Sequence, residues 1–131
     1  MDNVTLAITQ MRCSASADKN ISTAEELVHD AADQGAQLVL LQELFRDKYF
    51  CQVEDPKYFS LAQSKDGNVM IQHFQSLAKK LKIIIPLGFF EKANNSYFNS
   101  NAVINSDGEL LGIYRKSHIP HGFGYQEKFY F

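Results

Sequence analysis

The sequence has few cysteines, no long hydrophobic run and no excess of either charge, and each shortage excludes a class of protein. Its two cysteines, Cys13 and Cys51, are too few for a disulfide framework and favour a reduced compartment. The longest mostly apolar run, Ile83 to Phe90, is too short to cross a bilayer. Residues 1–4 lack the basic start of a signal peptide. We therefore expect a cytoplasmic protein with no membrane partner.

The charge balance argues against nucleic acid as a partner. Thirteen basic and fifteen acidic side chains give a formal net charge of −2, so no broad electropositive surface is expected. The 131 residues are 45% apolar and 12% aromatic, which is typical of one globular domain with its own core. The sequence contains no solenoid repeat, low-complexity tract or interdomain linker.

The first third of the chain has the pattern of a strand, a helix and a second strand. Residues 4–10 alternate between apolar and polar, which predicts a strand. Ser22 and Glu25 fit a capping box at the start of an amphipathic helix, and Asn20 is an alternative cap. The continuous apolar run 38–41 then predicts a strand covered on both faces in a parallel sheet. Together these elements predict a βαβ unit.

The middle of the chain repeats this pattern and adds a hairpin. Residues 70–81 carry an apolar stripe at helical spacing. Residues 83–90 predict a buried strand in which Pro86 indicates an edge or a bulge. Residues 98–104 and 110–115 flank a turn-rich tetrapeptide and predict a β-hairpin. The fold class is therefore α/β, in the order βαβαβ followed by a β-hairpin.

The last residues, 116–131, have the composition of a loop rich in histidine, glycine and aromatic side chains. The sequence printed here finishes with three consecutive aromatic residues, 129–131. We expect such a group to require further polypeptide to pack against.

Two ionisable side chains follow predicted strands at the edge of the sheet where ligands of α/β proteins collect. Glu43 comes after 38–41 and Lys116 after 110–115, and Glu127 lies in the following loop. A carboxylate and an ammonium in one crevice would shift each other's protonation and form an acid–base pair. Spacing alone also allows these side chains to be simply solvated.

Several separate motifs, occurring in the right order, resemble the nitrilase (carbon-nitrogen hydrolase) superfamily. Within the superfamily the resemblance is greatest to the group that hydrolyses N-carbamoylputrescine. The segments that carry it are 41–45, 49–52, 85–86 with 89–91, 112–120 and 124–131.

The resemblance implies a four-layer αββα sandwich in which two sheets pack face to face. Residues 1–131 would be the amino-terminal part of one carbon-nitrogen hydrolase domain and would supply the first portion of both sheets. The nucleophilic cysteine of the family follows the lysine on a later strand, so it would lie in the absent carboxyl-terminal part. We therefore expect this chain to be inactive by itself.

By resemblance, three residues carry the chemistry. Glu43 would be the general base that activates the thiol and then protonates departing ammonia, Lys116 would hold the oxyanion, and Glu127 would orient the site. The expected substrate is a small carbamoylated amine, converted in the case of N-carbamoylputrescine to putrescine, CO2 and ammonia. The resemblance implies no metal or organic cofactor, and it implies a homo-oligomer.

Four residues are expected to line the substrate pocket: Tyr49, Cys51, His121 and Tyr125. Cys51 and Cys13 are interpreted as packing or pocket-wall residues rather than as nucleophiles. His121 and Phe123 depart from the pattern of the group that hydrolyses N-carbamoylputrescine, in which an acidic residue and a proline are usual there. An imidazole in place of a carboxylate would weaken recognition of a substrate's distal ammonium.

Two other interpretations stay open. His118 and His121 with Glu127 are suitable ligands for a divalent metal ion, although their spacing does not place both rings on one helical face. The second alternative is a non-catalytic, truncated nitrilase-like module that binds partners, which the missing nucleophile favours.

Overall fold

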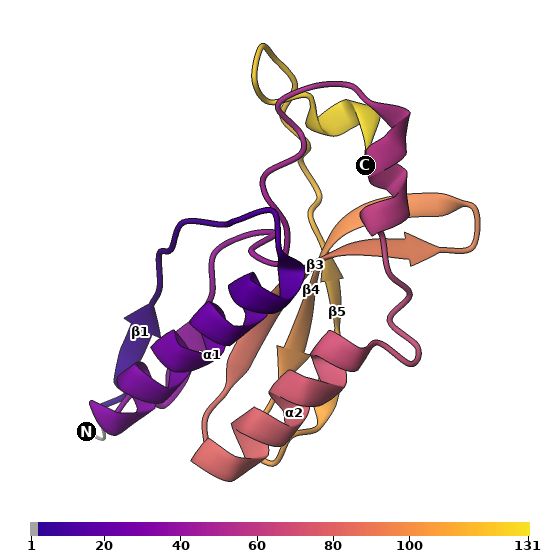
Figure 1. The fold of residues 1–131 in the computed structure, drawn as a ribbon. Helices are drawn as coiled ribbons and strands as arrows, with labels where there is room; N and C mark the ends of the chain where they lie inside the picture. The colour runs from indigo at the N-terminus through magenta and orange to yellow at the C-terminus, as the bar shows by residue number, and fades with distance from the viewer. Residues whose placement is uncertain (1–2) are drawn as a thin grey trace.

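The computed structural model describes residues 3–131 (Figure 1), so the prediction about the first residues of the chain lies partly outside it. The α/β class and the order βαβαβ with a following hairpin are as predicted, and two short 3-10 helices are added. Within the described residues no helix is both long and apolar enough to span a membrane. The elements are β1 (Leu6–Ile8), α1 (Ala17–Asp33), β2 (Leu38–Leu40), η1 (Pro56–Leu61), α2 (Val69–Leu81), β3 (Ile85–Ala93), β4 (Ser96–Ile104), β5 (Leu110–Arg115) and η2 (Glu127–Phe129).

Helix α1 begins earlier than predicted. Its N-cap is Ser16, whose hydroxyl accepts a hydrogen bond from the amide of Lys19 at 3.3 Å, so the caps predicted at Ser22 and Asn20 are wrong. Asn20 lies inside the helix and is buried. Its side chain accepts from the Ser14 amide at 2.7 Å and donates to the Arg46 carbonyl oxygen at 2.9 Å, so it ties the helix to the loop after β2.

The strands form a parallel pair and an antiparallel triplet. β1 pairs with β2 in parallel, as the βαβ prediction requires, with Leu6 opposite Leu38. β4 is the central strand of the triplet β3-β4-β5. A single parallel bridge joins the two groups, where the Val39 amide donates to the Ile84 carbonyl oxygen at 3.0 Å. Pro86 lies two residues beyond this bridge in β3, at the position that would donate the next hydrogen bond to β2, so its missing N–H ends the parallel pairing.

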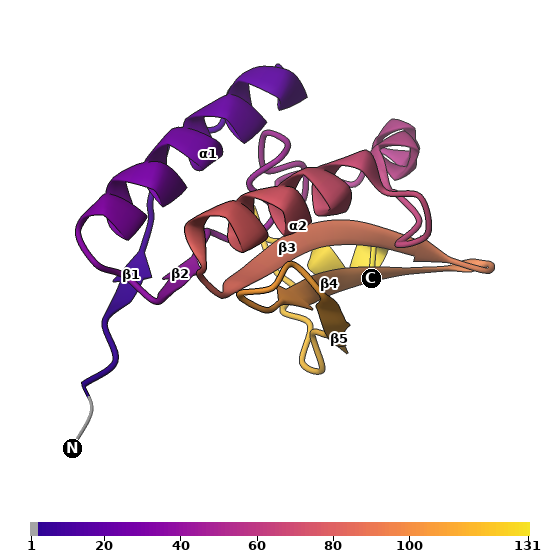
Figure 2. The same cartoon turned by 90° about the horizontal axis from the view of Figure 1, so that it is seen from below.

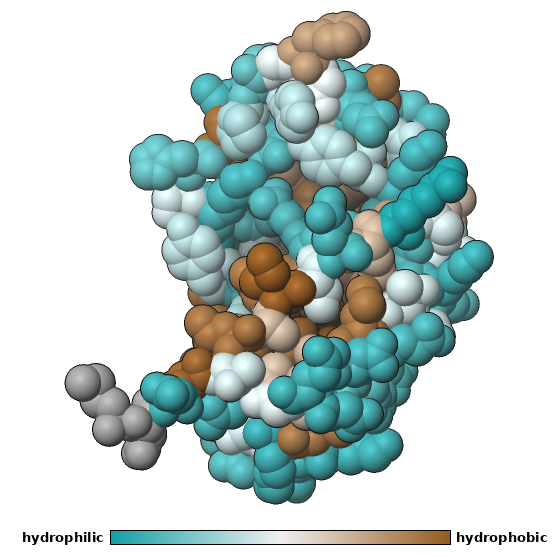
Figure 3. All heavy atoms as spheres, turned by 90° about the vertical axis from the view of Figure 1, so that its left-hand side faces the viewer, coloured by the Kyte–Doolittle hydropathy of each residue, from teal (hydrophilic) through white to brown (hydrophobic). Residues whose placement is uncertain are grey.

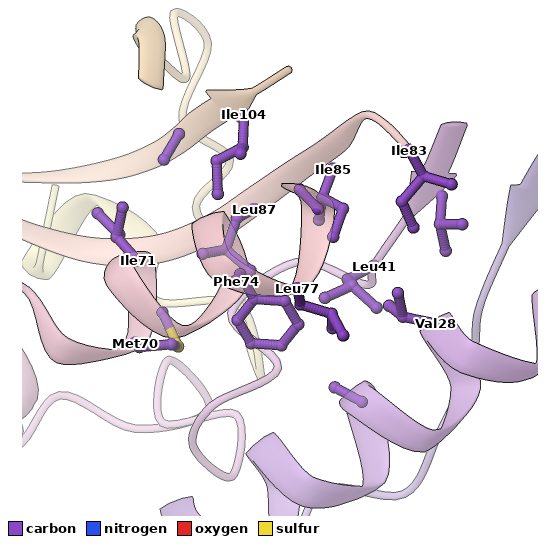
Figure 4. Packing of buried hydrophobic residues seen from close by; sticks show 14 of the residues in the cluster. Val28, Leu41, Met70, Ile71, Phe74, Leu77, Ile83, Ile85, Leu87 and Ile104 are labelled. Atoms are coloured by element: carbon purple, nitrogen blue, oxygen red, sulfur yellow. The ribbon is translucent and has the colours of Figure 1, made fainter. Parts of the chain in front are cut away.

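Both helices cover the same face of the strands (Figure 2), and the main core lies between them. Phe74 of α2 packs edge-on against Phe45 with ring centroids 5.8 Å apart. Leu87 of β3 and Ile104 of β4 point towards α2 from the strands (Figure 4). This burial of apolar area on one side of the sheet is the main source of stability.

Neither α1 nor α2 lies on the other face of the strands (Figure 2). Leu6, Ile8 and Leu40 are exposed large apolar side chains, and Figure 3, which views the molecule from the side of β1, shows apolar surface gathered there. Val39, by contrast, is fully buried on the helix side. The prediction that the strand 38–41 is covered on both faces is therefore wrong. Its side chains alternate between the face covered by the helices, where Val39 lies, and the uncovered face, where Leu40 lies.

The aromatic residues 129–131 pack within this chain, which corrects the expectation that they need further polypeptide. Tyr130 is buried, and its hydroxyl donates to the Val53 carbonyl oxygen at 2.6 Å. Its ring meets Phe50 edge-on, with centroids 5.0 Å apart, and Phe90 stacks on Phe50 at 4.9 Å. The segment that was expected to be a loop thus ends in η2, packed beside the segment that contains η1 (Figure 1).

The predicted β4–β5 hairpin is present, and a second hairpin joins β3 to β4. Gly108 lies in the β4–β5 turn with φ of 80°, and a Cβ at this position would lie only 2.5 Å from the Gln75 carbonyl oxygen of α2. Asn94 turns the second with φ of 54°. Asparagine tolerates this left-handed conformation better than most residues, which is the sequence signal for the second turn.

Candidate active site

Glu43 is held in a turn that crosses the uncovered face of β3. The turn passes so near the strand that a Cβ on Gly88 would lie 3.7 Å from the Glu43 Cα atom. Leu44, the next residue, has a positive φ of 54° and a buried side chain. A non-glycine residue in this conformation is strained, and the burial of Leu44 opposes relaxation of the turn. The Glu43 side chain is thereby directed over the sheet, where it is 48% exposed.

Lys116 directly follows β5 and is positioned by the ladder with β4. Its amide donates to the Asn99 carbonyl oxygen at 2.9 Å, which prolongs the pairing by one residue beyond the strand. The ammonium nitrogen then reaches two carboxylates. Nζ lies 3.1 Å from Glu43 Oε1 and 2.8 Å from Glu127 Oε2.

Glu127 begins η2 and has a buried side chain. Besides Lys116, it accepts a hydrogen bond from the hydroxyl of Tyr49 at 2.8 Å. A buried carboxylate is costly unless both of its oxygens find donors, and here each oxygen has one. Burial and the bond to Glu127 raise the pKa of Tyr49, so the hydroxyl remains a donor.

The three residues therefore form a chain of alternating charge that runs from Glu43 through Lys116 to Glu127. Burial alone would lower the pKa of the Lys116 ammonium, but its hydrogen bonds to Glu127 and Glu43 outweigh this and raise the pKa. Lys116 therefore stays charged at neutral pH. A fixed positive charge beside a half-exposed carboxylate is suited to stabilising an oxyanion next to a proton-transfer group.

A cavity of about 290 Å³ opens beside Glu43 and Lys116 on the uncovered face of the sheet. Its walls include Asn99 and Asn101 of β4 and Tyr114 of β5. Asn99 donates a hydrogen bond to Glu43 Oε1 at 2.5 Å. Sequence reasoning missed Asn99, although an uninterrupted polar stretch, 99–101, inside a strand was a usable signal.

The residues predicted to line the pocket fall into two groups. Tyr49 and Tyr125 lie close together, with ring centroids 6.3 Å apart, and the Gln126 amide donates to the Cys51 carbonyl oxygen at 2.6 Å. These three predicted residues therefore gather near Glu127. His121 is exposed, and none of the four predicted residues lines the cavity beside Glu43.

Neither cysteine has the environment of a nucleophile. Cys51 is fully buried, and burial together with the nearby charges of Glu127 and Glu43 raises its pKa to about 12. Burial also raises the pKa of Cys13, whose thiol donates to the Phe45 carbonyl oxygen at 3.2 Å. Reactive thiols have lowered pKa values, so both cysteines are held in the unreactive protonated form.

No metal centre is formed among residues 3–131. No group of three or more His, Cys, Asp or Glu side chains is placed to hold an ion there. The structure does not bring His118, His121 and Glu127 together as metal ligands.

A buried ion pair beside Lys116 was not predicted from the sequence. Glu91 of β3 is 1% exposed and accepts from the Arg115 guanidinium through both oxygens, at 2.7 and 2.8 Å. Ser100 also donates to Glu91, and the guanidinium lies 3.8 Å from the centre of the Phe98 ring. These contacts anchor the end of β5 directly before Lys116.

The ion pair predicts a stability that depends on pH. The hydrogen bonds from Arg115 hold the pKa of Glu91 below its usual value, although burial opposes them. The ion pair therefore contributes its full stabilisation above about pH 4.3, the usual pKa of a glutamate. This contribution is lost as the pH falls through the lowered pKa of Glu91 in the folded protein. We expect Glu91→Gln to lower the free energy of unfolding by about 1–3 kcal/mol at pH 7. Urea unfolding at pH 7 and below pH 4 measures this. The difference from wild type should narrow in acid.

The matched control is Glu26→Gln, because Glu26 is an exposed residue of α1. Its unfolding midpoint should stay at the wild-type value at both pH values. A Glu91→Gln difference that is the same at pH 7 and in acid would contradict the role of the ion pair.

Comparison with known proteins identifies the family of this chain. Residues 5–131 match the family model described as carbon-nitrogen hydrolase. The chain is 51% identical to N-carbamoylputrescine amidase of rice (Oryza sativa subsp. japonica), over 98% of this chain and 42% of the rice protein. It is 40% identical to a citrullinase of Francisella tularensis, over all of this chain and 46% of that protein.

A solved structure shows the same relationship in three dimensions. The crystal structure of a carbon-nitrogen hydrolase from Helicobacter pylori matches with a TM-score of 0.89 and 37% identity, over 98% of this chain and 44% of that one. The chain thus spans less than half the length of these relatives. The family predicted from the motifs is confirmed: the chain belongs to the carbon-nitrogen hydrolases of the nitrilase superfamily.

Proposed function

We propose that this chain contributes the acid–base and oxyanion-binding groups of an active site that hydrolyses a carbon-nitrogen bond in a carbamoylated amine. The observation that carries the proposal is the position of the Lys116 ammonium between Glu43 and Glu127, at 3.1 and 2.8 Å. The similarity to the rice amidase favours N-carbamoylputrescine as the substrate.

Each group has one task. Glu43 is the general base, because its carboxylate is half-exposed and one oxygen remains free to take a proton. Lys116 supplies the positive charge for the oxyanion. Glu127 orients Lys116 and, being buried and bonded through both oxygens, takes no part in proton transfer.

The reaction then has two halves. Glu43 accepts the proton of a cysteine thiol, and the thiolate attacks the ureido carbonyl carbon to give a tetrahedral intermediate whose oxyanion faces Lys116. Glu43 returns the proton to the departing nitrogen, so that ammonia leaves and an S-linked thiocarbamate of the cysteine remains. Water, deprotonated by Glu43, hydrolyses this thiocarbamate to a carbamic acid and the free thiol, and the carbamic acid decomposes to the amine and CO2.

The thiol in this proposal comes from polypeptide outside these 131 residues. Cys51 and Cys13 are unsuitable because both have raised pKa values. The family relatives are more than twice as long as the part this chain matches, so they have room for a further segment.

The uncovered face of the sheet supports the same proposal. Leu6, Ile8 and Leu40 expose apolar surface on the side where Glu43 and Lys116 also lie. A second sheet on this face would bury that surface and enclose the site, giving the four-layer αββα arrangement. Residues 1–131 would then be the amino-terminal part of a single domain.

A second candidate function is that of a non-catalytic module that binds partners through this face. The observation that favours it is the Cys51 thiol, which is fully buried and has a pKa of about 12, so this chain offers no nucleophile of its own.

A fusion enzyme separates the two functions. It consists of residues 1–131 followed by the part of the rice amidase that this chain does not match. We expect it to release ammonia from N-carbamoylputrescine, and we expect the 131-residue chain alone to release none. Cys51→Ala and Cys13→Ala should leave turnover by the fusion enzyme within a few-fold of its original rate.

Three results would contradict the proposal. A folded fusion enzyme that releases no ammonia from any carbamoylated amine would favour the non-catalytic module. Turnover by the chain alone that is lost in Cys51→Ala would assign the nucleophile to Cys51. Faster turnover of a carbamoylated compound bearing a carboxylate than of N-carbamoylputrescine would reject the diamine substrate.

A further inference from the structure

We propose that Asn99 is a positioning residue that fixes the carboxylate of Glu43 against Lys116 and selects which carboxylate oxygen is free for proton transfer. This inference rests on the proposed function, in which Glu43 is the general base. It concerns a residue that touches neither of the reacting bonds in that proposal.

Asn99 contacts both site residues from one rigid place in the sheet. It lies in β4, the central strand of the triplet, opposite Phe90 of β3, and is 6% exposed. Its side-chain nitrogen donates to Glu43 Oε1 at 2.5 Å, and its carbonyl oxygen accepts from the Lys116 amide at 2.9 Å. The distance between the two site residues is therefore set through a single residue.

Glu43 depends on this contact because little else holds its side chain. It is half-exposed and lies in a turn rather than in a strand. Among the described residues, its hydrogen-bond donors are Asn99 and Lys116, and both bind Oε1. Oε2 is left without a donor from residues 3–131 and is the oxygen available to exchange a proton with a thiol or a leaving group.

The charged and titratable groups that face Glu43 come from three segments. Lys116 follows β5, Glu127 begins η2, and Tyr49 and Cys51 lie in the segment after β2. Lys116 alone does not fix Glu43, because an ammonium is a rotatable point charge that Glu127 also binds. The planar amide of Asn99 is the directional donor, since amide hydrogens lie in fixed directions.

Two substitutions separate positioning from packing. Asn99→Asp keeps the size of the side chain but replaces the donor by a second carboxylate next to Glu43, whereas Asn99→Ala removes the side chain. The control is Asn95→Asp, because it makes the same chemical change at an exposed position in the turn between β3 and β4, outside the cavity. A packing role predicts that the alanine variant is the worse of the two.

In the fusion enzyme we expect the aspartate variant of Asn99 to be worse than the alanine variant at pH 8. Asn99→Ala should lower kcat about 10–100-fold with KM within about threefold, because a displaced general base costs this much in rate. Asn99→Asp should lose more than Asn99→Ala at pH 8 and regain activity relative to it as the pH falls, because the introduced carboxyl group becomes a donor once protonated. Asn95→Asp should show neither effect. An Asn99→Asp variant as active as wild type at pH 8 would overturn the proposal.

A second measurement uses the 131-residue chain and needs no activity. In NMR spectra recorded against pH, the side-chain amide of Asn99 should shift with the same midpoint as the Glu43 carboxyl carbon, and Glu43→Gln should abolish the shift. The Asn95 amide should not follow Glu43. If the Asn99 amide does not shift when Glu43 is protonated, the proposed contact is wrong. If the amide does shift with Glu43 but the wild-type fusion enzyme is inactive, the contact stands and the proposed reaction is rejected.

Discussion

Replacing Glu43 with glutamine should lower kcat of the fusion enzyme about 10²–10⁴-fold, the usual contribution of a general acid–base group. Glutamine keeps the size of the side chain, and its amide oxygen can still accept from Asn99 and Lys116 in the place of Oε1. It cannot take a proton from a thiol or return one to ammonia. KM should therefore change by no more than a few-fold, because binding groups are retained.

Steady-state ammonia release with N-carbamoylputrescine measures this prediction. Glu26→Gln provides the matched control, since it makes the same chemical change at an exposed position of α1. A Glu43→Gln enzyme that keeps more than about a tenth of kcat would show that the proton is carried by another group.

Lys116→Met should lower kcat about 10²–10³-fold, as expected when one group that stabilises an oxyanion is lost. Methionine retains much of the apolar stem and removes the charge. The effect differs from that of Glu43→Gln because the buried carboxylate of Glu127 also loses its partner, so the variant should unfold at a lower denaturant concentration as well.

A double variant distinguishes the lost charge from the lost stability. In Lys116→Met with Glu127→Gln, the buried position no longer carries an unpaired charge, so the unfolding midpoint should partly recover while kcat stays low. Lys82→Met is the control. It removes the same charge from an ion pair, with Asp107 at 3.5 Å, in which both side chains are exposed. Recovery of kcat in the double variant would show that Lys116 acts through folding and not on the oxyanion.

Local sequence patterns predicted the elements well where one face of the element is buried. The stripe through 70–81 gave α2 nearly to its observed ends, Val69–Leu81, because a period of 3.6 residues has few competing explanations. The start of α1 was wrong because Ser16, Asn20 and Ser22 all belong to types that cap helices. The structure assigns the cap to Ser16, and the Asn20 side chain instead bonds the backbone of Ser14 and Arg46.

Long-range placement limited the prediction of the site. Glu43 and Lys116 were singled out as residues that follow strands, and family resemblance supplied their proposed roles. Asn99 was missed because its bond to Glu43 depends on the turn passing close over Gly88 and on the register of β3 with β4. Burial of Glu91 likewise depends on Arg115, which is its partner across the sheet.

The most direct test is the position of a thiol relative to the Glu43 carboxylate in a crystal structure of the fusion enzyme. Our account predicts a cysteine sulfur from the added segment within about 4 Å of Glu43 Oε2, facing the side where Lys116 Nζ lies. A structure in which every thiol of that segment lies far from both head groups, in an enzyme that still hydrolyses N-carbamoylputrescine, would contradict it.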